Sequence, residues 1–311
     1  MEKDILVDDH SKATRSISII RSLLNDGSFK NKHRTASNFF SRKFKLDFVT
    51  VVLLILQKSI KPLQLVLNEF FKKLDNGVLV TKSAFTQARR HLKATAFVTK
   101  KAVLDVLYGD ENYEKAWGFR LLAIDGSKIH LPNTQEIVQE FGTIKFETTV
   151  GNNKKITGEH GYALASVMYD PLNKVVVDAC LAPAKAYEVD LALEQLKHTQ
   201  ANDLLLFDRN YTSYIFLASL VKFGRQFTGR CSKSSFKPAQ ELFKQYVTDS
   251  KKATLTASVA VKNKCKALGL PETITVRFVK LKLSTGETEV LVTSLLDNEK
   301  YTTQMLKELY N

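Results

Sequence analysis

The sequence predicts an α/β fold, in which a mixed sheet with helices on both faces carries a β-rich insertion and follows an all-helical region. Three observations predict it. Residues 1 to about 110 have a helical pattern, and within them residues 46–71 are rich in Leu, Val, Ile and Phe with few helix breakers. From about residue 116, short apolar runs alternate with helix-like stretches. Two of these runs end at an aspartate, Asp125 and Asp208.

The helical region contains the most apolar run of the chain, residues 48–56. A membrane span needs about 20 apolar residues, so this run predicts a buried helix and no membrane partner. Residues 82–93 predict another helix, after a turn at Asn76-Gly77 and with Thr81 or Ser83 as its N-cap.

Helical spacing places the apolar side chains of residues 82–93 on one face, and these are Phe85, Ala88 and Leu92. The basic side chains lie mostly on the other faces, and these are Arg89, Arg90 and Lys93. A second basic stretch runs from Lys30 to Lys45. Two helices with a basic second helix are typical of a DNA-reading unit. A helical bundle with a solvated basic face explains the same pattern, and the sequence leaves both open.

The second part of the chain predicts five strands and two helices. The strands are residues 119–124, 162–169, 175–181, 204–207 and 226–229, and the helices are residues 187–198 and 211–223. Asp170-Pro-Leu-Asn173 predicts a hairpin turn between the second and third strands, and Gly224 predicts the end of the second helix. Three hairpin-linked strands followed by two strands that arrive through helices match the ribonuclease-H-like fold.

Residues 233–293 interrupt this pattern. They contain strand-like pieces at 253–261, 274–283 and 291–295, with a turn at Ser284-Thr-Gly286, and predict a β-rich insertion. Residues 299–310 predict the start of a last helix. We therefore expect a helical domain over 1–110 and a ribonuclease-H-like domain over 111–311.

The two aspartates are 83 residues apart, yet the predicted fold places their strands side by side. Two carboxylates at one sheet edge can hold hard divalent cations, Mg²⁺ or Mn²⁺, for phosphodiester chemistry. A single aspartate after a strand is more often a turn or capping residue, and the pair favours the metal site. Lys128, Arg209 and Arg230 are candidate phosphate contacts near it; an ion pair with its neighbours is the alternative for Arg209.

The charge balance indicates the class of partner. The chain has 46 Lys and Arg against 32 Asp and Glu, a net charge of +14 and a pI near 9.5. This excess favours nucleic acid first and an acidic membrane surface second, with a solvated basic surface as the alternative. Three widely spaced cysteines without a C-x-x-C pair indicate neither a zinc knuckle nor a disulfide framework. His130, His160 and His198 have no metal-ligand spacing.

The segments Leu-Leu-Ala-Ile-Asp125-Gly-Ser and Leu-Leu-Leu-Phe-Asp208-Arg-Asn-Tyr-Thr-Ser resemble the first two aspartate motifs of the DDE transposases of bacterial insertion sequences, insertion-sequence-four type. Residues 223–230 resemble the strand that follows the second motif. The resemblance covers about residues 80–311. The family's third motif begins with Tyr, and the segment Lys-Glu-Leu-Tyr310-Asn resembles the opening of that motif. The Arg, catalytic Glu and Lys of that motif would lie about three, seven and fourteen positions beyond Tyr310, so we expect the last helix to be cut short.

The resemblance implies a transposase that cleaves DNA and transfers strands at insertion-sequence ends, as a homodimer with Mg²⁺ or Mn²⁺. Its partners would be double-stranded DNA, both terminal inverted repeats and target, in the bacterial cytoplasm at the nucleoid. Asp125 and Asp208 would be catalytic metal ligands, and Tyr310 would join the DNA-contacting residues. Glu299 and Glu308 do not fit the motif and are interpreted as solvated. Without the third carboxylate, an inactive DNA-binding remnant or regulator that occupies transposon ends is the alternative. A haloacid-dehalogenase-like phosphatase is disfavoured because Ser127 stands where a second aspartate is needed.

Overall fold

The computed structural model describes residues 11–42, 45–57, 60–74, 79–97, 101–150, 153–244 and 249–310. The chain divides into two compact units, Met1–Tyr113 and Glu114–Asn311. The expected turn at residues 76–77 and the basic Lys43 lie outside the described residues.

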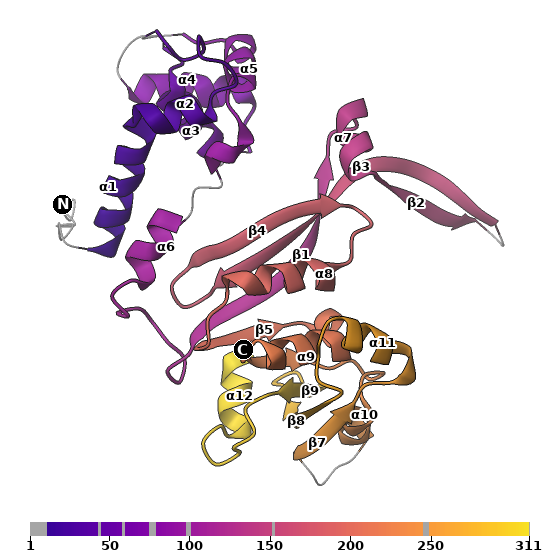
Figure 1. Ribbon diagram of the computed structural model, residues 1–311. Helices are drawn as coiled ribbons and strands as arrows, with labels where there is room; N and C mark the ends of the chain where they lie inside the picture. Colours follow the sequence, from indigo (N-terminus) through magenta and orange to yellow (C-terminus); the bar gives the residue numbers. More distant parts are fainter. Residues whose placement is uncertain are drawn as a thin grey trace. The chain divides into compact units, whose positions relative to one another are not determined.

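The N-terminal unit is helical throughout its described part, as predicted (Figure 1). Its helices are α1 (Lys12–Asn25), α2 (Gly27–His33), α3 (Phe48–Leu56), α4 (Leu63–Lys73), α5 (Lys82–Arg90) and α6 (Lys101–Tyr108), with a 3-10 turn at Ala94–Phe97. The apolar run is α3, which buries Phe48, Val51, Val52 and Leu54. None of the described helices is long and apolar enough to cross a membrane.

Thr81 begins α5, because its hydroxyl accepts a hydrogen bond from the backbone N–H of Ala84. Phe85 is buried, and Ala88 and Leu92 pack partly buried against the same core. The helical spacing therefore predicted the inward face of this helix correctly. The helix ends at Arg90 instead of Lys93, and Leu92 forms a bridge with Arg34.

The second unit is built on one sheet, whose strands run in the order β2-β3-β1-β5-β6-β9-β8-β7, with β4 on β3. The strands are β1 (Arg120–Leu131), β2 (Thr143–Val150), β3 (Asn153–Asp170), β4 (Val175–Pro183), β5 (Asp203–Phe207), β6 (Gln226–Arg230), β7 (Ser250–Thr256), β8 (Thr273–Lys282) and β9 (Thr288–Thr293). β1, β3 and β4 are antiparallel neighbours, whereas β5 and β6 are parallel to β1. This is the predicted ribonuclease-H-like arrangement.

The helices of this unit are α7 (Gln135–Phe141), α8 (Glu188–Gln195), α9 (Tyr214–Lys222), α10 (Lys237–Lys244), α11 (Val259–Ala267) and α12 (Thr303–Tyr310), with 3-10 turns η2 (Leu196–His198) and η3 (Arg209–Tyr211). α8 and α9 connect the strands where crossovers were predicted. The two opposite faces of the sheet are both covered. Leu206 on one face packs in a core with Leu306 of α12, and Phe207 on the other face contacts Phe216 of α9.

Three details differ from the sequence prediction. β1 does not end at Asp125 but continues to Leu131, because residues 125–131 pair with β3. α7 and the hairpin of β2 with β3 were not predicted, and they form the projecting arm in Figure 1. The expected strand 253–261 ends at Thr256, and Val259 begins a helix instead.

The insertion is not a separate sheet. β9 pairs antiparallel with β6, so β9, β8 and β7 extend the main sheet on the side of the second aspartate. Two helices, α10 and α11, belong to it, so the insertion is mixed and not purely β.

Candidate active site

Asp125 and Asp208 lie at neighbouring positions of two parallel strands. Ile124 of β1 is the register partner of Phe207 of β5, so the next residue of each strand lies one position further along. Neighbouring strands are about 4.8 Å apart, which sets the approximate separation of the two backbones. The backbone of Asp208 is extended, with φ −80° and ψ 173°, so the alternation of side chains continues through it.

Both carboxylates face the same side of the sheet. Side chains alternate along a strand, so Asp125 shares a face with Leu121, and Asp208 shares a face with Leu204 and Leu206. These three leucines belong to one hydrophobic core. Asp125 and Asp208 also line one cavity of about 520 Å³, together with Arg230, Glu308 and Tyr310.

The donor set of this cavity fits a hard divalent cation. One carboxylate oxygen of Asp208, Oδ1, is buried and has no hydrogen-bond partner. Its nearest ion-pair contact is Arg209 Nε at 3.8 Å. A buried acceptor without a partner is costly, and a cation would satisfy it. Among the described residues, no three His, Cys, Asp or Glu side chains are grouped closely enough to hold an ion by themselves. Mg²⁺ commonly takes one or two carboxylates and fills the rest of its shell with water and substrate phosphate, so two aspartates suffice.

Tyr310 fixes the end of α12 against the strands. Its hydroxyl has one proton to donate, and two backbone carbonyls accept from it, that of Thr228 at 2.6 Å and, at a longer distance, that of Phe207 at 3.2 Å. Burial raises the pKa of Tyr310 above its usual range. Because the hydroxyl is already engaged by the sheet, the structure gives Tyr310 an anchoring role. Its predicted contact with DNA stays a prediction.

Arg230 is held in place between two neighbours. Its Nε lies 3.2 Å from a carboxylate oxygen of Glu289, and its guanidinium carbon lies 5.3 Å from the centre of the Tyr310 ring. Arg230 lines the aspartate cavity and also a second cavity of about 540 Å³, which Arg209 and Lys233 share. Two of the predicted phosphate contacts, Arg209 and Arg230, therefore lie together beside Asp208.

Lys128 does not line the aspartate cavity. Because β1 continues past Asp125, the side chain three positions later points to the opposite face of the sheet. Lys128 lines a cavity of about 1030 Å³ there, with Lys145, Lys185 and Asn210. A contact between Lys128 and a phosphate at the aspartates stays a prediction that this geometry does not favour.

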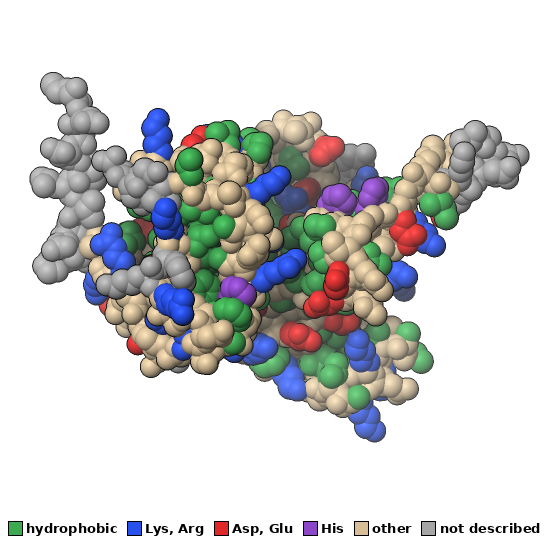
Figure 2. Space-filling view, turned by 90° about the horizontal axis from the view of Figure 1, so that it is seen from above, with side chains coloured by type: hydrophobic (Ala, Val, Ile, Leu, Met, Phe, Trp, Pro, Cys, Tyr) green, Lys and Arg blue, Asp and Glu red, His purple; other side chains and the backbone are tan. Residues whose placement is uncertain are grey.

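The basic residues predicted in the N-terminal unit are accessible. Arg89, Arg90 and Lys93 are all exposed. Residues 1–113 contain 20 Lys and Arg against 11 Asp and Glu, so this unit carries most of the excess positive charge. Figure 2 shows Lys and Arg side chains spread over the visible face of the protein, among apolar side chains and backbone.

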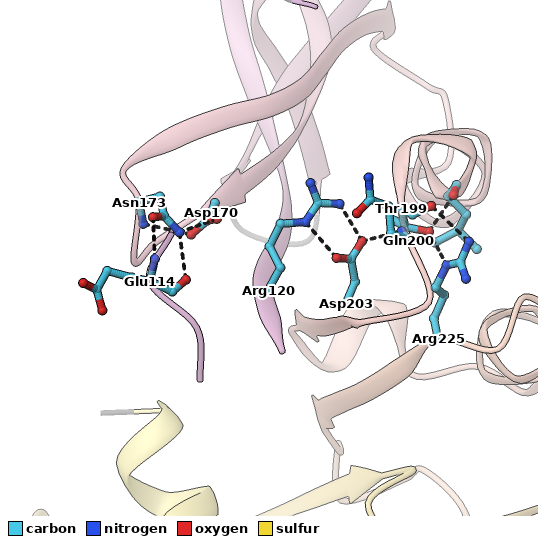
Figure 3. Close-up of polar contacts among 9 residues, drawn as sticks. Glu114, Arg120, Asp170, Asn173, Thr199, Gln200, Asp203 and Arg225 are labelled. Atoms are coloured by element: carbon cyan, nitrogen blue, oxygen red, sulfur yellow. Dashed lines mark hydrogen bonds and ion pairs between the residues drawn. The ribbon is translucent and has the colours of Figure 1, made fainter. Parts of the chain in front are cut away.

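A buried ion pair, not predicted from the sequence, lies at the opposite ends of the same two strands. Arg120 Nε donates to Asp203 Oδ1 at 2.7 Å, and Arg120 Nη2 donates to Asp203 Oδ2 at 2.8 Å (Figure 3). Their side chains are 3 % and 0 % exposed. A signal was present, because Arg120-Leu-Leu-Ala-Ile-Asp125 and Asp203-Leu-Leu-Leu-Phe-Asp208 place opposite charges at the same distance before each aspartate.

Two further polar residues, also not predicted, meet at Gly126, on the face of the sheet opposite the aspartate carboxylates and on the same side as the Lys128 cavity. A Cβ atom added to Gly126 would lie 2.9 Å from Cδ of Glu188 and 3.1 Å from the hydroxyl oxygen of Tyr211. Tyr211 is 1 % exposed, and its hydroxyl has no hydrogen-bond partner. Burial raises the pKa of Tyr211, and the negative charges of Glu188, Asp125 and Asp208 raise it further.

The structure also joins two histidines that have no metal-ligand spacing in the sequence. The rings of His130 and His160 lie 5.3 Å apart on the sheet, beside Phe146 and Tyr162. The four side chains form an aromatic cluster at the base of the β2–β3 arm. No carboxylate or cysteine completes a metal site there within the described part of the chain.

The known proteins to which this chain is similar are transposases. The family model described as "Transposase DDE domain" matches residues 116–311. No curated protein matches the chain. Among solved structures, a piggyBac transposase synaptic complex with hairpin DNA is similar, with 11 % identity and a TM-score of 0.44, over 95 % of this chain and 65 % of that chain. A Mos1 transposase paired-end complex with the left transposon end is similar at 12 % identity and a TM-score of 0.23, over 60 % of this chain and 73 % of that one.

The chain spans just under two thirds of the length of the piggyBac transposase that it matches. The family model covers well over half of the chain, and the matched segment contains both aspartates and all nine strands of the described sheet. The chain therefore belongs to the DDE transposase domain family, whose reaction is DNA transposition.

Proposed function

We propose that this protein cleaves DNA at the ends of an insertion sequence and transfers the freed strands, with Asp125 and Asp208 as its metal ligands. The observation that carries the proposal is the register of β1 and β5, which brings the two aspartates to one cavity. A bound Mg²⁺ or Mn²⁺ pair would activate the attacking oxygen and stabilise the leaving oxygen of the phosphodiester.

The basic residues around this cavity would hold the DNA backbone. Arg209 and Arg230 share a cavity next to Asp208, and a guanidinium can bind phosphate oxygens in a bidentate manner. Glu289 and the Tyr310 ring fix Arg230, so little side-chain entropy remains to be lost when a phosphate binds.

The helical N-terminal unit would bind the ends of the element. Its excess of Lys and Arg supports duplex DNA as the ligand. The contacts would be made by Arg89 and Arg90 at the end of α5 and by Lys93 just after it, all of them exposed. The terminal inverted repeats and the target would be the DNA partners, bound by a homodimer at the bacterial nucleoid. The insertion-sequence-four type rests on the motifs around Asp125 and Asp208.

A second candidate is a DNA-binding protein that occupies transposon ends without cutting them. It is favoured by the excess of Lys and Arg in the N-terminal unit, which supports binding to DNA and does not require a metal site. The resemblance implies a third carboxylate about seven positions beyond Tyr310.

A nicking assay separates the two candidates. The 311-residue protein is incubated with Mn²⁺ and a supercoiled plasmid that carries the element's ends, in parallel with Asp125→Asn and Asp208→Asn. Nicking by the parent chain that both variants lose supports the enzyme. Binding of the ends in a gel-shift assay, with no nicking above the level of the variants, supports the regulator.

A further inference from the structure

The aromatic cluster at the base of the β2–β3 arm is exposed. Its four rings come from three neighbouring strands, and the ring centres that are in contact lie between 5.2 and 5.9 Å apart. The side chains of His130 and His160 are exposed, and Phe146 is 43 % exposed. Exposed rings that gather in one patch, instead of lying singly, indicate a binding surface.

The cluster continues the Lys128 cavity on the same face of the sheet. On each of three strands, a residue that lines the cavity and a ring of the cluster are two positions apart, so their side chains share a face. These pairs are Lys128 with His130 on β1, Ile144 with Phe146 on β2, and Leu164 with Tyr162 on β3. Lys128 is also the register partner of Leu164, and His130 is that of Tyr162. Cavity and cluster therefore form one surface.

The cavity adds positive charge to this surface. Its volume is about 1030 Å³, and three exposed lysines line it, Lys128, Lys145 and Lys185. Two carboxylates, those of Glu159 and Glu188, also line it, so the lysines remain in excess by one charge. Positive charge along a groove, combined with exposed aromatic rings, is what binds unpaired nucleic acid, because phosphates contact the charges and bases stack on the rings.

The surface is connected to the two aspartates by short stretches of chain. Lys128 is three residues after Asp125, and Asn210, which also lines the cavity, is two residues after Asp208. The carboxylates face the other side of the sheet. However, β1 pairs with β5 only as far as Ile124, so the described part of β5 does not cover β1 beyond that residue.

We propose that the aromatic cluster and the Lys128 cavity together bind single-stranded DNA next to the cut. Bases would stack on the exposed rings, and the lysines would contact the phosphates. The strand would reach this face from the aspartates by passing the end of β5. The inference rests on the proposed function, because cleavage at Asp125 and Asp208 would supply the free strand. Binding of a single strand by itself needs no metal.

The test is fluorescence anisotropy with the 311-residue chain, without divalent metal. The probes are a labelled single strand of about 16 nucleotides and a duplex of the same sequence. Loss of one stacking partner weakens single-strand binding about five- to 150-fold. We expect Phe146→Ala and His130→Ala each to weaken it at least about fivefold. Duplex affinity should not change, because paired bases are already stacked on one another. Phe146→Trp keeps an aromatic ring and should retain the parental affinity.

Ile156→Ala is the matched control, because Ile156 is an exposed apolar residue of β3 without a ring. It should leave both affinities unchanged. Equal losses in Ile156→Ala and Phe146→Ala would show a change in the arm itself and overturn the inference. Equal losses for the single strand and the duplex would overturn it too, since stacking would not explain them. A parent chain that does not bind the single strand would also overturn it.

The lysines are tested by the salt dependence of the same titration. Each phosphate contact on a single strand contributes about 0.7 to the slope of log K against log salt concentration. Lys128→Gln and Lys185→Gln should each reduce the magnitude of that slope by about 0.7. Lys197→Gln, at an exposed lysine of η2 outside the cavity, should leave it unchanged. A slope that neither cavity variant changes would place the strand elsewhere and overturn the inference.

The nicking assay distinguishes failure of this inference from failure of the proposed function. Nicking that only the aspartate variants lose, with equal single-strand affinity in the parent and Phe146→Ala, would overturn the inference and leave the proposed function standing. A chain that never nicks, but whose single-strand affinity depends on Phe146 and His130, would support the binding surface and contradict cleavage.

Discussion

Arg120 and Asp203 are direct register partners on β1 and β5, and each stands five residues before one of the two aspartates. Their bidentate ion pair is buried at the start of the strands, where Asp203 also accepts a hydrogen bond from the backbone N–H of Gln200. A slip of one residue would break this pair. The pair therefore fixes the register that places Asp125 beside Asp208 at the other end.

Breaking this pair should be costly. Arg120→Met leaves Asp203 as a buried charge without its ion-pair partner, which typically costs about 3–5 kcal/mol. Urea unfolding measures this loss. The double variant Arg120→Met, Asp203→Leu should recover most of it, because two apolar groups replace the pair. A double variant no more stable than Arg120→Met would contradict this account of the register.

The two aspartates should be needed for the metal but not for the fold. Asp125→Asn and Asp208→Asn each keep the shape of the side chain and remove a charged oxygen ligand. We expect Mn²⁺ binding to be lost or weakened at least about 100-fold, with affinity for duplex DNA nearly unchanged. Calorimetry and gel-shift assays measure the two quantities. Asp249→Asn, at an aspartate outside the aspartate cavity, should change neither.

DNA binding should depend steeply on salt. Each phosphate contact contributes about 0.9 to the slope of log K against log salt concentration for duplex DNA. Arg89→Ala and Arg90→Ala should each reduce the magnitude of that slope by about one and weaken binding to all sequences equally. Fluorescence anisotropy between 50 and about 200 mM salt provides the slope. An unchanged slope in both variants would place the DNA elsewhere on the protein.

The N-terminal unit should lose stability on mild acidification. Burial lowers the pKa of His33 below 6.5, with help from the positive charges of Lys32 and Lys93, and His33 Nδ1 hydrogen-bonds Thr95. The unfolded chain therefore binds a proton on this residue at a higher pH than the folded chain does. The contribution of His33 to the free energy of unfolding is fully present above the pKa of the unfolded chain. It is lost as the pH falls through 6.5 toward the lower pKa of His33 in the folded chain. His33→Asn keeps a hydrogen-bonding group but cannot titrate.

Thermal unfolding between about pH 7.5 and 5.5 compares the two proteins. The midpoint of the parent should fall more steeply than that of His33→Asn. Parallel curves would show that His33 titrates in the folded protein as it does in the unfolded chain.

Tyr310 should matter for the docking of α12. Tyr310→Phe removes the hydrogen bonds to the carbonyls of Phe207 and Thr228, which should cost about 1–3 kcal/mol. The expected result is faster hydrogen exchange confined to residues 303–310. Exchange at the parental rate there would show that the packed leucines of α12 hold the helix on the sheet without the Tyr310 hydroxyl.

The sequence predicted those parts of the fold whose apolar patterns are unambiguous. Residues 204–207 are apolar throughout because both faces of β5 are buried, and such a run predicts a central strand. It could not predict β2, whose residues lie on a projecting arm and alternate without a buried face. Val259-Ala-Val261 predicted a strand because its residues are β-branched or small, yet a helix begins at Val259, with Ser258 at its N-cap position.

The two aspartates were chosen as candidates because each follows an apolar run. Their closeness in the folded protein was predicted from the expected order of the strands. The position of Lys128 was not predictable in the same way. It depends on β1 continuing past Asp125, and that depends on pairing with β3, whose partner residues lie 30 to 42 positions further along the chain. Glu188 and Tyr211 carried no sequence signal, because their approach depends on α8 packing against η3 and on the open space beside Gly126.

The central claim is that Asp125 and Asp208 hold one divalent site between them. Iron-directed cleavage tests it most directly: Fe²⁺ replaces Mg²⁺, and ascorbate with peroxide then cuts the backbone next to the bound ion. The account predicts two cuts in the same chain, near residues 125 and 208, both suppressed by excess Mg²⁺ and absent in Asp208→Asn. Cleavage at one position alone, or cleavage that Asp208→Asn leaves intact, would contradict it.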